Sequence, residues 1–127
     1  VQAVLSQSLE EYPVELSPEV GALFEELRAN PRVAPPKTLK ATLRPYQEVG
    51  YSWMYKNAQL NLGSLIADDM GLGKTIQTIS MLAFLKQYKN VQRPHLIIAP
   101  KVTLGNWVSE LKKWLPSLKP LKLEATK

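Results

Sequence analysis

The sequence of 127 residues contains no cysteine, which excludes disulfide bonds and thiolate metal sites. It contains a single histidine, His95, so a histidine-based metal centre is not expected. No apolar run approaches the roughly 20 residues of a membrane span, and we expect no membrane partner. The start, Val1-Gln2-Ala3-Val4, lacks the basic residues and the apolar stretch of a secretion signal. Together these absences favour an intracellular protein.

Charge is unevenly spread along the chain. Residues 1–37 contain six acidic and three basic residues, which gives a net charge of −3. Residues 38–127 contain five acidic and thirteen basic residues, which gives +8 and accounts for the overall +5. A basic region of this kind indicates either an anionic partner such as nucleic acid or a solvated surface with spare lysines, and charge alone leaves both open.

Residues 1–37 are predicted to contain one short helix and a linker. Ser17-Pro18-Glu19 is typical of a helix start, with an N-cap serine, a proline in the first position and an acidic first turn. The apolar residues that follow recur at helical spacing: Val20, Leu23, Phe24 and Leu27. Asn30-Pro31 ends this helix, and the proline-rich residues 31–36 cannot continue a regular element. We therefore place a domain boundary near residue 37, with residues 38–127 as the second unit.

Residues 38–127 alternate between helical and strand patterns. Helices are predicted from Pro45 to Leu60, from Ile76 to Tyr88 and from Thr103 to Leu115. Short apolar runs predict buried strands at Ser64–Ala67 and His95–Ala99, and a third strand could begin at Leu121. Strands that alternate with helices imply right-handed crossovers and a parallel sheet. The predicted fold class is α/β, a parallel sheet with flanking helices.

Two of these helices carry apolar residues at helical spacing. In the first they are Tyr46, Val49, Trp53 and Met54. In the last they are Leu104, Trp107, Val108, Leu111, Trp114 and Leu115. Because Trp107 and Trp114 lie on this stripe and not among the lysines, we expect both to pack in the core.

The strongest chemical signal is Gly71-Leu72-Gly73-Lys74-Thr75, between a predicted buried strand and a predicted helix. Backbone N–H groups at a helix start carry partial positive charge, and glycines let the backbone approach phosphate oxygens. Lys74 can reach the β and γ phosphates of a nucleotide, and the Thr75 hydroxyl is placed to bind Mg²⁺. The strict motif has glycine where this chain has Asp68, so a plain glycine turn is the alternative.

Residues 66–79, with the sequence IADDMGLGKTIQTI, resemble the nucleotide motif of the Swi/Snf-like ATPases of helicase superfamily two. At the positions of Asp68 and Asp69 this family has a pair of acidic residues, although the second is most often glutamate. The resemblance implies a RecA-like P-loop domain, here incomplete, with ATP and Mg²⁺ as cofactors. It implies catalytic roles for Lys74 and Thr75, and nucleotide contacts from Asp69, Met70, Gly71, Leu72, Gly73, Lys74, Thr75 and Ile76.

Two further stretches resemble motifs of the same family, in the same order. Leu43-Arg44-Pro45-Tyr46-Gln47 is similar to its adenine-reading motif, in which Gln47 would hydrogen-bond the adenine edge. Arg44 would pack near the base or position the loop; the alternative is a plain capped helix. Residues 96–107 resemble the second-strand motif, whose loop meets the DNA backbone. There Lys101 offers charge and Thr103 begins a helix, and both features favour phosphate.

The three motifs cover residues 38 to about 118. The resemblance implies the ATP-binding part of a DNA-dependent ATPase that translocates on double-stranded DNA, partnered by the rest of its lobe and by a second RecA-like lobe. Such a protein is expected in the nucleus of a eukaryote or the cytoplasm of a prokaryote. The family's Asp-Glu-x-His motif and second-lobe arginines are not found, so we expect a piece of a longer protein that does not hydrolyse ATP alone.

Two other functions remain open. The chain could be a non-catalytic fragment that binds nucleotide or a partner. A small P-loop kinase is the weaker alternative, because such kinases need neither the motif at Gln47 nor the motif at Trp107.

Overall fold

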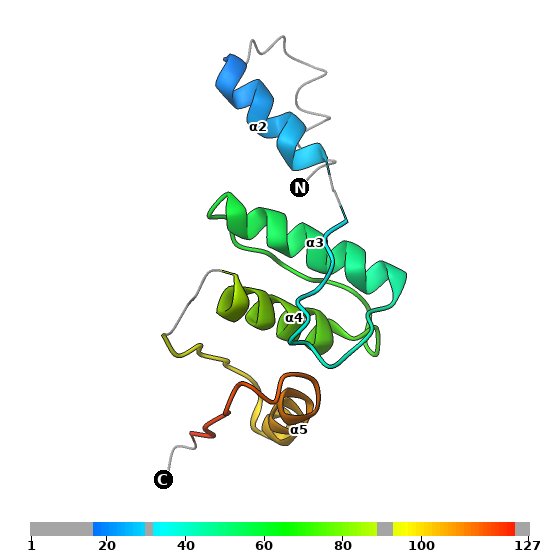
Figure 1. Cartoon of the computed structure of the whole chain (residues 1–127), viewed down its shortest axis with the longest axis vertical. Coiled ribbons are helices and arrows are strands. Elements are labelled where there is room, and N and C mark those ends of the chain that lie inside the picture. The colour runs from blue at the N-terminus through cyan, green and yellow to red at the C-terminus, as the bar shows by residue number, and fades with distance from the viewer. Residues whose placement is uncertain (1–16, 30–31, 89–92, 124–127) are drawn as a thin grey trace.

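The computed structural model describes residues 17–29, 32–88 and 93–123. Within these ranges the regular elements are α2 (Pro18–Arg28), α3 (Pro45–Gln59), α4 (Lys74–Gln87), the 3-10 turn η1 (Lys101–Thr103) and α5 (Leu104–Trp114). Figure 1 shows α3 and α4 side by side, starting at the same end of the molecule, with α5 below α4 and α2 set apart above α3. The main packed body is therefore a layer of three helices.

The helices α2 and α3 begin where the sequence predicts, and α4 begins two residues before the predicted Ile76. Ser17 caps α2, and its Oγ accepts a hydrogen bond from the Val20 backbone N–H at 3.4 Å. Pro45 is the first residue of α3, where its missing N–H costs nothing. The helix α4 starts at Lys74, directly after the glycine-rich turn. Local signals thus account for the start of each of these helices.

Of the four apolar residues that recur along α3, only Met54 is buried. Tyr46 and Val49 are each 40% exposed and Trp53 is 37% exposed. The buried face instead carries Tyr51 and Met54 together with polar side chains: Gln47, Ser52, Lys56 and Asn57. The helical period is correct, but the buried residues of α3 are more polar than the apolar spacing predicts, and three of them bond to segments other than α4.

The predicted parallel sheet is not formed among the described residues. Residues 64–67 and 95–99 have no strand pairing there, and only residues 121–123 of the third predicted strand are described. A strand satisfies its backbone groups only through neighbouring strands, and small sheets need three or more to be stable. Leu65, Leu96 and Ile98 accordingly remain exposed. The strands predicted in these ranges are therefore not confirmed by the described residues.

The core lies between α3, α4 and α5 and is closed by the segment that precedes α3. Its buried members include Leu39 and Leu43 from that segment, with Ile79, Phe84, Leu111 and Leu115 from α4 and the α5 region. Trp107 and Trp114 pack against this cluster, which confirms the expected core role of both.

Two hydrogen bonds fix the path of the segment before α3. The Val33 N–H donates to Ser52 Oγ at 2.9 Å, and the Lys40 N–H donates to the Trp114 carbonyl at 2.7 Å. This segment therefore bridges α3 and the end of α5.

The domain boundary near residue 37 remains a prediction from the charge and proline pattern. In the described ranges no helix has the length and apolar character needed to cross a membrane.

Candidate functional site

The turn before α4 depends on two glycines in the left-handed region. Gly71 has φ of 86° and Gly73, the N-cap of α4, has φ of 80°. Side chains other than glycine are strained there. The turn presents the first N–H groups of α4, which have no partner within the helix, at an exposed surface. The glycine turn at a helix start, on which the prediction of phosphate binding rests, is therefore present, and phosphate binding itself stays a prediction.

Lys74 folds back over this turn. Its Nζ donates to the Asp68 carbonyl at 2.5 Å and to the Asp69 carbonyl at 2.9 Å. Both acceptors are neutral backbone groups, so these two contacts do not pair the ammonium with a countercharge. These contacts are of a kind that a phosphate oxygen can replace, because a charged acceptor forms the stronger hydrogen bond.

Gln47 joins the start of α3 to the same turn. Its Oε1 accepts from the Arg44 N–H at 3.0 Å, and its Nε2 donates to the Leu72 carbonyl at 3.1 Å. The side chain is 7% exposed and lies so close to Gly73 that a Cβ there would be 2.4 Å from Nε2. The structure thus brings Arg44 and Gln47 to the turn, although 25 residues separate Gln47 from Leu72.

Sequence reasoning missed a second amide that supports the turn. Gln77, on the first turns of α4, is 0% exposed, and its Nε2 donates to Asp68 Oδ2 at 3.2 Å. Its Oε1 has no hydrogen-bond partner and faces Gly50, where a Cβ would lie 2.0 Å away. The available signal was a glycine in the middle of a predicted helix, which is unfavourable unless close packing requires it.

A hollow of about 350 Å³ opens beside the turn. Its walls are Tyr46, Val49 and Gly50 on α3, with Asp68 and Leu72 on the turn. The walls are mostly apolar, whereas the adjoining turn offers N–H groups and the Lys74 ammonium. This arrangement suits a ligand that combines a flat apolar part with an anionic part.

The remaining predicted residues fall into two groups. Met70 is 96% exposed at the tip of the turn, Thr75 is half-buried in the first turn of α4, and Ile76 packs against the core. Lys101 and Thr103 lie elsewhere, in η1, where Thr103 Oγ1 donates to the Pro100 carbonyl at 2.8 Å. Across the described ranges no hydrogen bond connects η1 to the glycine turn, and no group of three or more His, Cys, Asp or Glu is placed to hold a metal.

Comparison with known proteins gives consistent matches to residues in this region. The family model of the SNF2-related domain matches residues 46–127. The chain is 42% identical over 87 residues to the ISWI chromatin-remodeling complex ATPase CHR17 of Arabidopsis thaliana, which covers 68% of this chain and 8% of that protein. It is 40% identical over 102 residues to the transcription regulatory protein SNF2 of Saccharomyces cerevisiae, which covers 80% of this chain and 6% of that protein.

A solved structure is also similar. The Sulfolobus solfataricus SWI2/SNF2 ATPase core in complex with double-stranded DNA matches with a TM-score of 0.65 and 45% identity. The match covers 69% of this chain and 18% of that one. The chain therefore spans only a small part of the length of each of these three proteins.

We predict that Gly73→Ala destabilises the fold more than Gly71→Ala. Both substitutions place a side chain at positive φ, which costs roughly 1–2 kcal/mol. Only the Cβ at residue 73 also collides with Gln47, since nothing lies within 4 Å of the Cβ position at residue 71. Overpacking of this kind adds roughly 1–3 kcal/mol. Denaturant unfolding of the two variants measures the difference.

A double-mutant cycle isolates the contact. In a Gln47→Ala background the cost of Gly73→Ala should fall toward that of Gly71→Ala, with a remainder from Ile76 Cγ2, which lies 3.2 Å from the added Cβ. An unchanged cost would show that Gln47 does not press on the turn.

Proposed function

The chain belongs to the family of SNF2-related domains, and on that premise we propose that its glycine turn binds Mg-ATP as the nucleotide-binding part of a DNA-dependent ATPase. The observation that carries the proposal is the turn itself: two left-handed glycines open α4, and Lys74 lies over them. The similar proteins named above are a chromatin-remodeling ATPase, a transcription regulatory protein and an ATPase core in complex with double-stranded DNA. In a eukaryote this function belongs in the nucleus.

The phosphates are assigned to the turn and to Lys74. The N–H groups at the start of α4 would hold phosphate oxygens, and the Lys74 ammonium would exchange the Asp68 and Asp69 carbonyls for the β and γ phosphates. Thr75, in the first turn of α4, would bind the Mg²⁺ that neutralises phosphate charge. Asp68 is held by Gln77 through its carboxylate, so it stays beside the turn while Lys74 moves.

The base is assigned to the hollow between α3 and the turn. Tyr46, Val49 and Leu72 give it apolar walls on which an aromatic ring can lie. An amide has two N–H groups and two acceptor lone pairs, and Gln47 uses one N–H and one lone pair within the protein. The remaining N–H and lone pair of the amide are complementary to an acceptor and a donor on the edge of adenine. Arg44 is placed to position this amide through its own backbone N–H.

DNA is assigned to the basic side of the chain outside the turn. Lys101 in η1 is exposed, and α5 carries the exposed Lys112 and Lys113. We propose that Lys101 and the N–H groups near Thr103 contact backbone phosphates, which position a protein on DNA without reading its sequence. The net charge of +8 on residues 38–127 supports such contacts.

We predict that Lys74→Ala weakens Mg-ADP and Mg-ATP binding by roughly 10- to 100-fold, the value of about one charge-assisted hydrogen bond. Lys86→Ala is the matched control, because Lys86 lies near the other end of α4 and donates to the Ser117 carbonyl. Titration with a fluorescent nucleotide gives both affinities. Equal affinities for Lys74→Ala and the unmodified chain, with both folded, would remove Lys74 from the site.

A second prediction separates two roles of Gln47. If the amide hydrogen-bonds adenine, Gln47→Ala weakens the binding of ATP more than the binding of GTP. The difference should be roughly the 1–3 kcal/mol of an unpaired buried polar group. If it only fixes the turn through Leu72, both nucleotides lose affinity equally. Competition titrations with ATP and GTP decide between these roles, and an unchanged ATP preference would refute adenine reading.

A third prediction concerns turnover. Hydrolysis needs a positioned water and a cation facing the γ-phosphate, and the family resemblance assigns both to regions beyond this chain. We therefore expect steady ATP hydrolysis by the full-length protein, stimulated by duplex DNA, and none by the 127 residues alone. Phosphate release by each protein, with and without DNA, measures this. Turnover by the 127 residues that Lys74→Ala abolishes would contradict the assignment, and indifference of the full-length protein to DNA would favour a plain nucleotide-binding role.

A further inference from the structure

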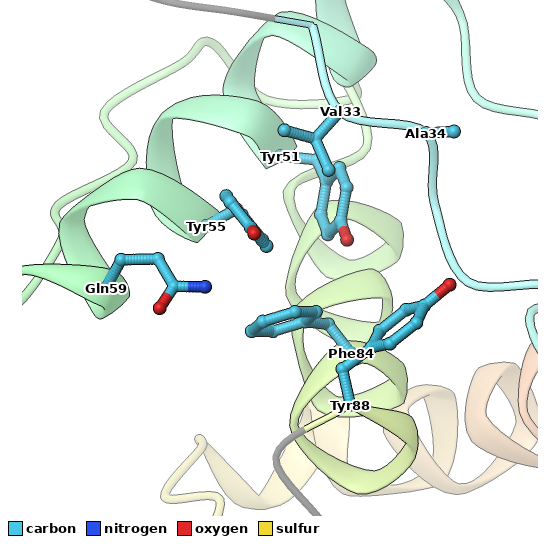
Figure 2. Close-up of a pocket in the computed structure, with 7 residues that line it drawn as sticks. All are labelled: Val33, Ala34, Tyr51, Tyr55, Gln59, Phe84 and Tyr88. Carbon is cyan, nitrogen blue, oxygen red and sulfur yellow. The ribbon is translucent and has the colours of Figure 1, made fainter.

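An aromatic hollow lies at the ends of α3 and α4 opposite to the glycine turn. It measures about 250 Å³ and is bounded by Tyr51, Tyr55, Phe84 and Tyr88, with Val33 on the side of the preceding segment. Figure 2 shows the side chains of α3 and α4 facing one another across this space. Phe84 is ten residues after Lys74, which places it about 15 Å farther along α4. The hollow is therefore distinct from the proposed nucleotide site.

The floor and the rim of the hollow differ in chemistry. Tyr51 is 0% and Phe84 is 3% exposed, so these two rings form the floor. Tyr88 is 59% exposed, and Gln59 is also exposed, so they form the rim. Figure 2 shows Gln59 turning its amide toward the rings. A ligand that enters past the rim would meet aromatic surfaces first and the floor last.

The floor presents an unsatisfied donor. The Tyr51 hydroxyl is buried and has no hydrogen-bond partner, and in Figure 2 it points toward Phe84 and Tyr88. Burial raises the pKa of Tyr51 to about 12, with smaller effects from Tyr55 and Tyr88, so the hydroxyl keeps its proton at neutral pH. A buried polar group normally has a partner, and an acceptor delivered into the hollow would supply one.

The size and charge of the hollow select the ligand. A dry apolar cavity of roughly 150 Å³ can hold benzene, and this hollow has room for a ring with a short substituent. No charged side chain lines it, so an anion or a cation would lack a countercharge. Aromatic rings alone can attract a cation through their faces. Phe84, however, already packs against the edge of Tyr55 at 4.6 Å and against Tyr88 at 5.6 Å between ring centroids.

We propose that this hollow is a binding site for a small uncharged aromatic molecule that carries a hydrogen-bond acceptor, with the ring held between α3 and α4 and the acceptor on the Tyr51 hydroxyl. Val33 belongs to the wall and is tied to α3 through Ser52, so an occupant would contact both the preceding segment and the two helices. The site does not depend on nucleotide binding at Lys74.

The test uses benzamide as the probe, with toluene as a ring that lacks the acceptor and tetramethylammonium as a cation. Amide chemical shifts of the labelled 127-residue chain are followed during each titration. We expect benzamide to bind more tightly than toluene and to shift the amide signals of residues around Tyr51, Phe84 and Tyr88. The Lys74→Ala variant should bind benzamide with the same affinity as the unmodified chain. Tyr51→Phe keeps the ring and removes the hydroxyl, and it should weaken benzamide about tenfold while leaving toluene unchanged.

Trp53→Phe is the control, because Trp53 is on the same helix, is 37% exposed and lines neither this hollow nor the one beside the glycine turn. This variant should bind benzamide like the unmodified chain. Three results would each overturn the proposal: benzamide shifts confined to other surfaces or absent, equal benzamide affinities for Tyr51→Phe and Trp53→Phe, or tighter binding of tetramethylammonium than of benzamide. The first result would mean that the hollow holds only water. The last would mean that its aromatic rings form a cation-binding site.

Discussion

The Gln47 amide links the two elements on which the candidate nucleotide site depends. One end accepts from the Arg44 N–H at the start of α3, and the other donates to the Leu72 carbonyl within the glycine turn. Because the side chain is almost fully buried, its position is set by packing as well as by hydrogen bonds. The turn can approach this amide only with glycine at residue 73. The shape of the turn is thus a tertiary property, fixed from α3 and not from α4 alone.

The same helix holds the rest of the structure through its other buried polar residues. Ser52 accepts from the Val33 N–H, Asn57 donates to Ser64 Oγ at 3.0 Å, and Lys56 donates to the Ala29 carbonyl at the end of α2. Each bond reaches a different segment, and each satisfies a polar group that would be costly to bury alone. This explains why α3 turns its more polar side inward. Gln77 is the exception, since one of its two amide atoms stays unpaired against Gly50.

Exposed apolar side chains mark where the described structure is unlike a complete α/β domain. Leu65, Leu96 and Ile98 are 79–88% exposed, whereas their neighbours Ile66 and Ile97 are half-buried. Alternating exposure is the pattern of a strand that is covered on one face only. The solved ATPase core that resembles this chain is matched over 18% of its length, so most of that core has no counterpart here.

The sequence by itself determined much of the local structure and the family. Helix starts at Ser17-Pro18 and Pro45, the glycine turn before Lys74 and the core tryptophans of α5 were all predictable, because capping, backbone freedom and helical period act within a few residues. The sequence motifs also indicated the family correctly. Only the tertiary structure decided which side of α3 is buried, that Gln77 supports Asp68, and that the predicted strands remain unpaired. These outcomes depend on partners distant in the chain: a buried face, a satisfied amide and a paired strand are each defined by what lies opposite.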